Sequence, residues 1–285
     1  MQQDRIAILV DSGCDVPPAV IEQYPIYVLP LKINFTDGEY RDGVDITAEQ
    51  VYERLPVEIP KTSLPSGSEI IDILDRIKAD GYEKVLVVTI SSGLSGTFNS
   101  IRLALESYEG LESYLFDTRN ISIGGGILAI EAARCIAEGI SWAELTATLP
   151  QWRSRSKVFF CVKTLEYLQK GGRIGLITAL LGNALNLKPI ISCNEEGIYY
   201  SVAKCLGRKA SVRKMLELAQ EFAQGAKRVR IALMHGSAAE EAAALIPELE
   251  KRIPHGEISV QGQISPSLGV HTGPGLIGVG ILRIE

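Results

Sequence analysis

The 285-residue chain lacks the features that mark membrane and secreted proteins. No apolar run reaches the roughly 18 residues that a membrane-spanning helix needs. The N-terminal segment MQQDRIAILVDSG has no basic region followed by a long apolar stretch, so we expect no signal peptide. We therefore predict a protein without a membrane span.

Cysteine and histidine are also scarce, with five and three residues. An odd number of cysteines, none of them spaced as C-x-x-C, argues against a disulfide scaffold and a zinc site. We expect no metal and no cofactor, and the free thiols fit the reducing cytoplasm. The cysteines are Cys14, Cys135, Cys161, Cys193 and Cys205.

Positive charge is limited as well. The net charge is −5 and no long basic run is present. Non-specific nucleic-acid binding depends on phosphate neutralisation by Lys and Arg. We therefore expect no nucleic-acid partner.

The composition, with 46% hydrophobic and 22% charged residues, is typical of a globular chain. In the first half, apolar runs alternate with helical patterns, which predicts a parallel sheet flanked by helices. Its strands are expected at 5–10, 26–33 and 84–90, and its helices at 47–55, 67–81 and 97–108. The second half contains a β-hairpin pattern at 187–207, which predicts a mixed sheet. The expected domains are residues 1–153 and 154–285.

A loop rich in Ser and Gly follows the predicted strand 84–90 and reads ISSGLSGTFNS. The free N–H groups and the dipole of the next helix favour an anion there. Ser92 and Ser95 add hydroxyl donors. The P-loop pattern is absent because no Lys follows Gly96. The loop therefore suits a phosphate or a carboxylate, and an ordinary strand-to-helix turn remains the alternative.

The same loop also resembles the nucleophile elbow G-x-S-x-G of serine hydrolases. Thr97 stands where the last Gly of that pattern belongs. Asp117 and His271 follow Ser95 in the chain order of a hydrolase triad. A serine hydrolase that cleaves acyl esters through Ser95 is thus one alternative function, and a protein that binds a small phosphate ligand is another.

Further polar residues lie near expected strand ends. Asp11 and Asp15 in VDSGCDVP could bind a metal or cap a helix, and capping is favoured. In PKTSLPSGSE, Ser66 and Glu69 have the spacing of a capping box, which leaves Thr62 without an assigned role.

Two more candidates lie in the second half. Arg173 sits among glycines in LQKGGRIG and could contact an anion or a partner, or be merely exposed. His271 lies in a Gly- and Pro-rich segment, ISPSLGVHTGPG, which we expect to be a loop that leaves the imidazole accessible.

Several motifs together resemble the DegV family across nearly the whole chain. They are ILVDSGCDVP, KTSLPS, ISSGLSGTFNS, FDTRNISIGGG, LEYLQKGGRIG, LKPII and HTGPGLIGVG, in this order. The resemblance implies a long-chain fatty acid bound between two α/β domains. It also implies a non-catalytic subunit of a fatty acid kinase, which presents the carboxylate for conversion to an acyl phosphate in phospholipid metabolism. Transient contact with a membrane surface would be compatible with this role.

The resemblance also implies site residues. Thr62 and Ser95, with Ser92 nearby, match positions that bind the carboxylate, and His271 matches a position close to the head group. Arg173 matches the G-G-R-I motif and is kept as a possible head-group or partner contact. The chain departs from the family pattern at two positions, with Leu64 in place of a common Gln and Gly13 in place of a common Thr. Leu64 could alter the mouth of the pocket.

Overall fold

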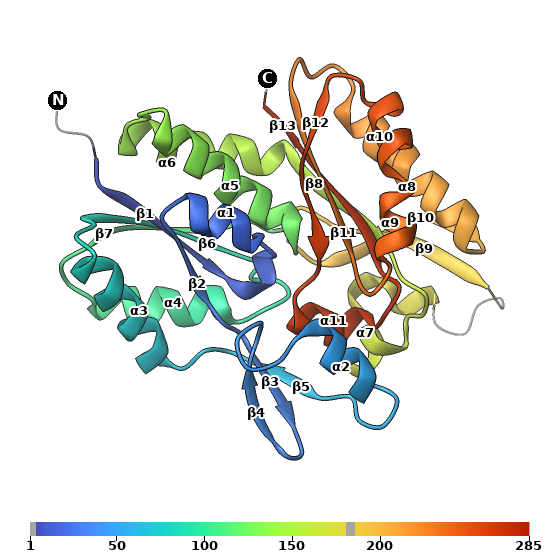
Figure 1. The fold of residues 1–285 in the computed structure, drawn as a ribbon, viewed down its shortest axis with the longest axis horizontal. Helices are drawn as coiled ribbons and strands as arrows, with labels where there is room; N and C mark the ends of the chain where they lie inside the picture. Colours follow the sequence, from blue (N-terminus) through green and yellow to red (C-terminus); the bar gives the residue numbers. More distant parts are fainter. Residues whose placement is uncertain (1–3, 181–185, 285) are drawn as a thin grey trace.

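Four short strands in the first half form one parallel sheet, which confirms the expected type of sheet. The computed structural model describes residues 4–180 and 186–284, and Figure 1 shows this sheet on the left. Its strand order is β2 (Ile26–Leu29), β1 (Ile6–Asp11), β6 (Lys84–Thr89) and β7 (Glu112–Asp117), with every neighbouring pair parallel. All six residues of β1 are buried, because helices cover both faces.

The alternation of side chains along β1 decides which helices pack on each face. Ala7 and Leu9 point to α3 (Gly67–Ala79) and α4 (Thr97–Ser107). Ile8 and Val10 point to α5 (Ile123–Ala137) and α6 (Trp142–Ser154). A short 3-10 turn, η1 (Ser12–Cys14), and helix α1 (Pro18–Gln23) follow β1.

The prediction of a single strand at 26–33 is wrong. Pro30, which lacks an N–H group for a sheet, separates β2 from β3 (Lys32–Phe35). Strand β3 joins β4 (Gly38–Arg41) and β5 (Lys61–Ser63) in a small antiparallel sheet. The segment 36–43 therefore contains a strand, although its sequence, TDGEYRDG, is rich in turn-forming residues.

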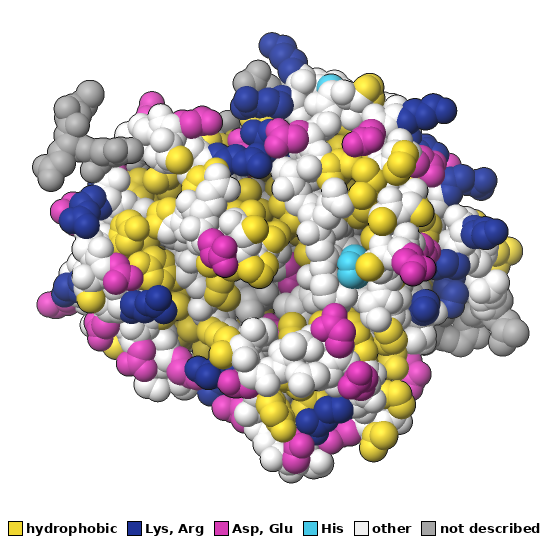
Figure 2. Space-filling view, in the orientation of Figure 1, with side chains coloured by type: hydrophobic (Ala, Val, Ile, Leu, Met, Phe, Trp, Pro, Cys, Tyr) yellow, Lys and Arg dark blue, Asp and Glu magenta, His cyan; other side chains and the backbone are white. Residues whose placement is uncertain are grey.

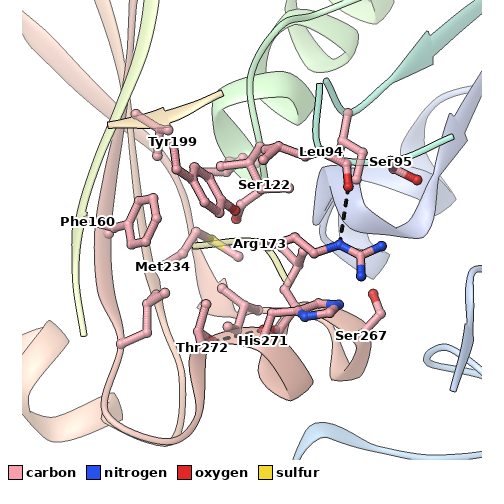
Figure 3. A pocket seen from close by; sticks show the side chains of 18 of the residues that line it. Leu94, Ser95, Ser122, Phe160, Arg173, Tyr199, Met234, Ser267, His271 and Thr272 are labelled. Atoms are coloured by element: carbon pink, nitrogen blue, oxygen red, sulfur yellow. Dashed lines mark hydrogen bonds between the residues drawn. The ribbon is translucent and has the colours of Figure 1, made fainter. Parts of the chain in front are cut away.

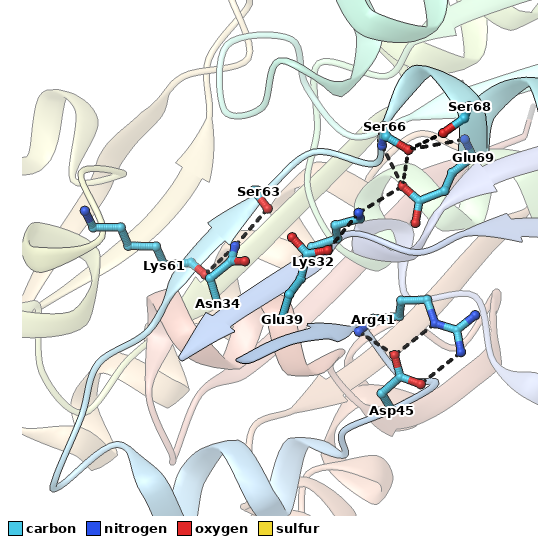
Figure 4. A network of polar contacts seen from close by, with 10 residues as sticks. All are labelled: Lys32, Asn34, Glu39, Arg41, Asp45, Lys61, Ser63, Ser66, Ser68 and Glu69. Atoms are coloured by element: carbon cyan, nitrogen blue, oxygen red, sulfur yellow. Dashed lines mark hydrogen bonds and ion pairs between the residues drawn. The ribbon is translucent and has the colours of Figure 1, made fainter. Parts of the chain in front are cut away.

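Polar contacts hold this small sheet to the start of α3 (Figure 4). The Nζ atom of Lys32 lies 2.9 Å from a carboxylate oxygen of Glu39 and 3.1 Å from one of Glu69. Glu69 and Ser66 form the predicted capping box. Thr47 likewise caps α2 (Ala48–Arg54). These contacts fix β5, which carries Thr62.

The second half forms a mixed six-stranded sheet, which confirms the expectation (Figure 1). The order is β10 (Tyr199–Leu206), β9 (Leu187–Cys193), β8 (Ser156–Cys161), β13 (Ile277–Arg283), β11 (Val229–His235) and β12 (Gly256–Gln263). Only the pair β11–β12 is parallel. Helix α8 (Arg208–Ala223) covers one face. The remaining elements are α7 (Glu166–Lys170), η2 (Gly175–Leu180), α9 (Ala239–Ala243), α10 (Ile246–Arg252) and α11 (Pro266–Thr272).

Helix α5 lies between the two sheets and packs on both (Figure 1). Every residue from Ile123 to Ala133 is buried. This part of the helix is apolar on all sides except at Glu131, which pairs with Arg230. One hydrophobic cluster therefore runs from Ile8 and Val10 in the first sheet to Val158 and Phe160 in the second. The predicted domain boundary at 153/154 falls at the end of α6, just before β8.

The expectation of a loop around His271 is wrong, because this segment is helix α11. Pro266 occupies its first turn, where a missing N–H group costs nothing.

Figure 2 shows one face of the molecule, on which basic and acidic side chains are interspersed. Hydrophobic side chains border a hollow between the two halves on this face. Within residues 4–180 and 186–284, no helix is long and apolar enough to cross a membrane.

Candidate functional site

A cavity between the two sheets brings together most of the predicted site residues. Its empty space is about 740 Å³, including a part that is open to solvent. Polar side chains that line it are Thr62, Ser95, Ser122, Arg173, Tyr199, Ser267, His271 and Thr272. Figure 3 shows Ser95, Arg173 and His271 toward one side of the view and Phe160, Tyr199 and Met234 toward the other.

The apolar floor comes from one row of the second sheet. Met234 pairs with Gly278, and Gly278 pairs with Phe160, so three neighbouring strands place these residues side by side. All three line the cavity. Because Gly278 has no side chain, a trough runs between the side chains of Met234 and Phe160. Ile123 of α5 and Leu276 add to its apolar lining.

Thr62 and His271 meet at the polar side of the cavity. The Thr62 Oγ1 and His271 Nε2 atoms are 2.8 Å apart, although 209 residues separate them in the chain. The Nδ1 atom of His271 is buried and has no hydrogen-bond partner among the described residues. A Cβ atom at Gly171 would lie 2.2 Å from this Nδ1 atom, so only glycine fits there.

Burial lowers the pKa of the His271 imidazole from 6.5 to about 4, and the nearby positive charge of Arg173 contributes a smaller part. The ring is therefore neutral at pH 7.

Arg173 is held by backbone oxygens at the same side of the cavity. Its Nη1 atom donates to Gly171 O at 2.8 Å, and its Nε atom donates to Leu94 O at 3.4 Å. The side chain thus lies between the loop after β6 and the segment after α7. It supplies a positive charge beside the neutral His271, in a position to contact an anionic head group.

The Ser-rich loop contributes Ser95 to the cavity but not Ser92. Ser95 Oγ lies 2.8 Å from Thr97 Oγ1, just before α4 begins. Ser92 is exposed and points to the end of β7, where its N and Oγ atoms donate to Asp117 at 3.2 and 2.6 Å. Asp117 competes for Ser92 because β6 and β7 are neighbours that end at the same edge. The structure therefore does not bring Ser92 together with the other four predicted residues.

The hairpin between β9 and β10 packs against this loop. Gly197 has φ +75°, and a Cβ atom there would lie 1.8 Å from Ser91 Oγ. Arg119 Nη1 donates to Glu195 O at 3.0 Å. The second half of the chain thus supports the loop that carries Ser95.

The triad of a serine hydrolase is not assembled. Ser95 Oγ pairs with Thr97, His271 pairs with Thr62, and Asp117 accepts from Ser92. A nucleophile needs a base within hydrogen-bond reach, and His271 is engaged elsewhere. This geometry disfavours the hydrolase alternative.

Besides Thr272, three polar residues of the lining were not singled out in the sequence. Ser122 has φ +54°, a rare conformation for a non-glycine residue. Ser267 lies on α11, one turn before His271. The phenol of Tyr199 is buried, which raises its pKa. The motif FDTRNISIGGG contains Ser122 and was the available signal for it.

Within the described ranges, no group of three or more His, Cys, Asp or Glu residues is placed to hold a metal ion. The five cysteines, Cys14, Cys135, Cys161, Cys193 and Cys205, are all free thiols.

Comparisons with known proteins agree on the family to which the chain is similar. A family model described as "Uncharacterised protein, DegV family" matches residues 5–283. A DegV domain-containing protein of Clostridium acetobutylicum is 42% identical over 280 residues, which cover 98% of this chain and 99% of that protein.

Two solved structures have the same fold. A DegV family protein from Thermus thermophilus, described by its fatty acid binding, superposes with a TM-score of 0.91 at 30% identity and covers 98% of this chain and 100% of its own. A stearic-acid-binding protein from Eubacterium ventriosum has a TM-score of 0.89 at 28% identity, with 98% of both chains covered. The chain therefore belongs to the DegV family.

Proposed function

We propose that this protein binds a long-chain fatty acid in the cavity between its sheets and presents the carboxylate to a separate fatty acid kinase. The observation that best supports this proposal is the cavity itself. It has an apolar trough over Gly278 and a polar side formed by Thr62, Ser95, Arg173 and His271. Fatty acid binding by the related structures supports the ligand. The kinase partner comes from the family resemblance alone.

The tail would supply most of the affinity. Burial of one methylene is worth about 0.8 kcal/mol, so about fourteen methylenes offer roughly 11 kcal/mol before the costs of association. The polar groups would then orient the acid.

The head group would be held mainly by neutral donors. We assign the proton of His271 to Nε2, which then donates to Thr62 Oγ1 and leaves the unpartnered Nδ1 as a bare acceptor. The hydroxyl of Thr62 is then free to donate to a carboxylate. Arg173 would add a positive charge. Its Nε and Nη1 atoms each donate to a backbone oxygen, of Leu94 and Gly171, and its other N–H groups could donate to the carboxylate.

In this proposal the protein is a lipid-binding subunit rather than an enzyme. It would work in the cytoplasm, take its ligand during transient contact with a membrane surface, and serve phospholipid metabolism. The hydrogen bonds of Ser95 to Thr97 and of His271 to Thr62 support the non-catalytic role, because neither provides Ser95 with a general base.

The test is to identify what the purified protein contains. Mass spectrometry of an organic extract should show a C14–C18 fatty acid, and the delipidated protein should rebind one equivalent. Addition of the methyl ester is the matched control, since it keeps the tail and removes the charge. Empty extracts together with no rebinding would refute the proposal, and a recovered sugar phosphate would favour the phosphate-binding alternative.

A further inference from the structure

Two buried carboxylates of the first half hold the start of helix α11. Asp15 Oδ1 accepts from Ser265 N at 2.8 Å, and Asp42 Oδ1 accepts from Ser267 N at 3.0 Å. Ser267 Oγ also donates to Asp42 Oδ2 at 2.5 Å. The residues joined in this way are 225 and 250 positions apart in the chain.

The two carboxylates perform the capping that α11 does not perform for itself. The first N–H groups of a helix have no partner inside it, and the side chain of the N-cap residue Ser265 makes no capping hydrogen bond. The motif VDSGCDVP supplies Asp15. It also supplies Ser12, whose Oγ donates to Asp42 Oδ2 at 2.6 Å. Asp15 thus caps a helix, as expected, but this helix belongs to the second half of the chain.

Further bonds satisfy both carboxylates despite their burial. Only 8% of Asp15 and 2% of Asp42 is exposed, and an unpaired charge at such a depth would be costly. Asp15 accepts a second hydrogen bond, from the hydroxyl of Ser122, which lines the cavity. The carboxylates therefore lie directly behind the polar wall of the site.

The position of helix α11 determines where His271 lies in the head-group site. Ser267 and His271 are four residues apart, so they lie on the same face of the helix, and both line the cavity. With only seven residues, α11 has little stability of its own. The 2.8 Å contact between His271 and Thr62 requires this helix to stay in place.

We propose that Asp15 and Asp42 are positioning residues for His271. They fix α11 against the first half of the chain and so set the distance between His271 and Thr62. The role of this arrangement in holding a carboxylate rests on the proposed function, but the positioning itself is a property of the protein without ligand.

The experiment is an NMR titration of the histidine ring protons in the unliganded protein. In the wild type, the His271 signal should titrate near pH 4, and its absence in His271→Gln assigns it. In Asp42→Ala, α11 should loosen and water should reach the ring. The pKa should then rise by about one unit or more toward 6.5.

Two control variants accompany it. Asp42→Asn retains an acceptor for Ser267 N and should restore most of the wild-type titration. Asp45→Ala removes a nearby acid that is paired with Arg41 on the surface, and it should leave His271 unaffected. A folded Asp42→Ala protein in which His271 titrates as in the wild type would overturn the proposal.

A milder change covers the case in which Asp42→Ala does not fold. Ser267→Ala removes one of the bonds to Asp42 and should raise the pKa of His271 by a smaller amount, and no rise would again overturn the proposal. With fatty acid present, Asp42→Ala combined with His271→Ala should bind no more weakly than His271→Ala alone. If the titration shifts but the wild type binds no fatty acid, the positioning stands and the proposed function fails.

Discussion

A single methyl group at Gly278 should weaken fatty acid binding without weakening the fold. In Gly278→Ala, the new Cβ atom would lie 3.2 Å from Phe160 Cβ and 3.8 Å from Leu276 Cδ2, on the floor of the cavity. The backbone of Gly278 is not in the left-handed region. Alanine lowers the entropy of the unfolded chain, which stabilises the fold by about 0.5–1 kcal/mol. The tight contact, which requires Phe160 to shift by a few tenths of an ångström, offsets this gain, so we expect little net change in the free energy of unfolding.

The effect on binding follows from the width of the trough. A tail that lies over Gly278 between Met234 and Phe160 would meet the added methyl directly. Overpacking of this kind costs about 1–3 kcal/mol, which is a loss of roughly 5-fold to 150-fold in affinity. Acids that end before this point should lose less, so the preference should move toward shorter chains.

The assay is a competition of C10 to C18 fatty acids by native mass spectrometry, with thermal unfolding of the delipidated protein in parallel. Gly262→Ala is the matched control, because it also lies on the second sheet and its Cβ would make only an ordinary contact with Met234 at 3.7 Å. If Gly278→Ala binds every acid as the wild type does, the tail does not cross this row and our account of the cavity is wrong.

Three further predictions concern the chemistry of the site and the buried acids. Thr62→Ala and Ser95→Ala should each lower fatty acid affinity roughly tenfold to a hundredfold, through loss of about 1.5–3 kcal/mol. They should lower kinase-dependent acyl phosphate formation by a larger factor, because phosphoryl transfer needs the oxygen held in line; equal rates for wild type and variants would contradict the site. The protein should not react with a fluorophosphonate, and labelling of Ser95 that is lost in His271→Ala would show a hydrolase. Burial raises the pKa of Asp11 from 3.8 to about 7, so the protonated acid is favoured in the folded state. The free energy of unfolding should fall as the pH rises from about 4 to 7, by at most about 4 kcal/mol from this group, and Asp11→Asn should reduce that fall in urea unfolding at pH 5 and pH 8.

The sequence predicts the fold well in segments whose structure follows from one local pattern of side chains. Strands β1 and β6 are continuous apolar runs, and such runs mark a parallel sheet that is covered on both faces. The prediction fails at 26–33 because Pro30 interrupts an apolar pattern that otherwise reads as one strand. It fails at α11 because the caps of this helix, Asp15 and Asp42, lie more than 200 residues away, where no local pattern can indicate them.

The candidate site is predicted in part for similar reasons. The resemblance implies Thr62, Ser95, Arg173 and His271 as site residues, and the structure brings these four together around one cavity. Ser92 is drawn away by Asp117, a neighbour that depends on the order of strands in the sheet. The trough at Gly278 arises from the register between three strands, which a sequence does not reveal.

The position of α5 has a consequence for cooperativity. Its two opposite faces are buried against different sheets, so a fragment that ends at Ser154 would expose the face that packs on β8 and β13. The other fragment would expose the matching face of its sheet. Each half keeps one hydrophobic cluster of its own, but the cluster that contains α5 draws residues from both halves, so heat should unfold the whole protein in a single transition. Two fragments produced separately should therefore be much less stable alone and regain the native fold when they are mixed.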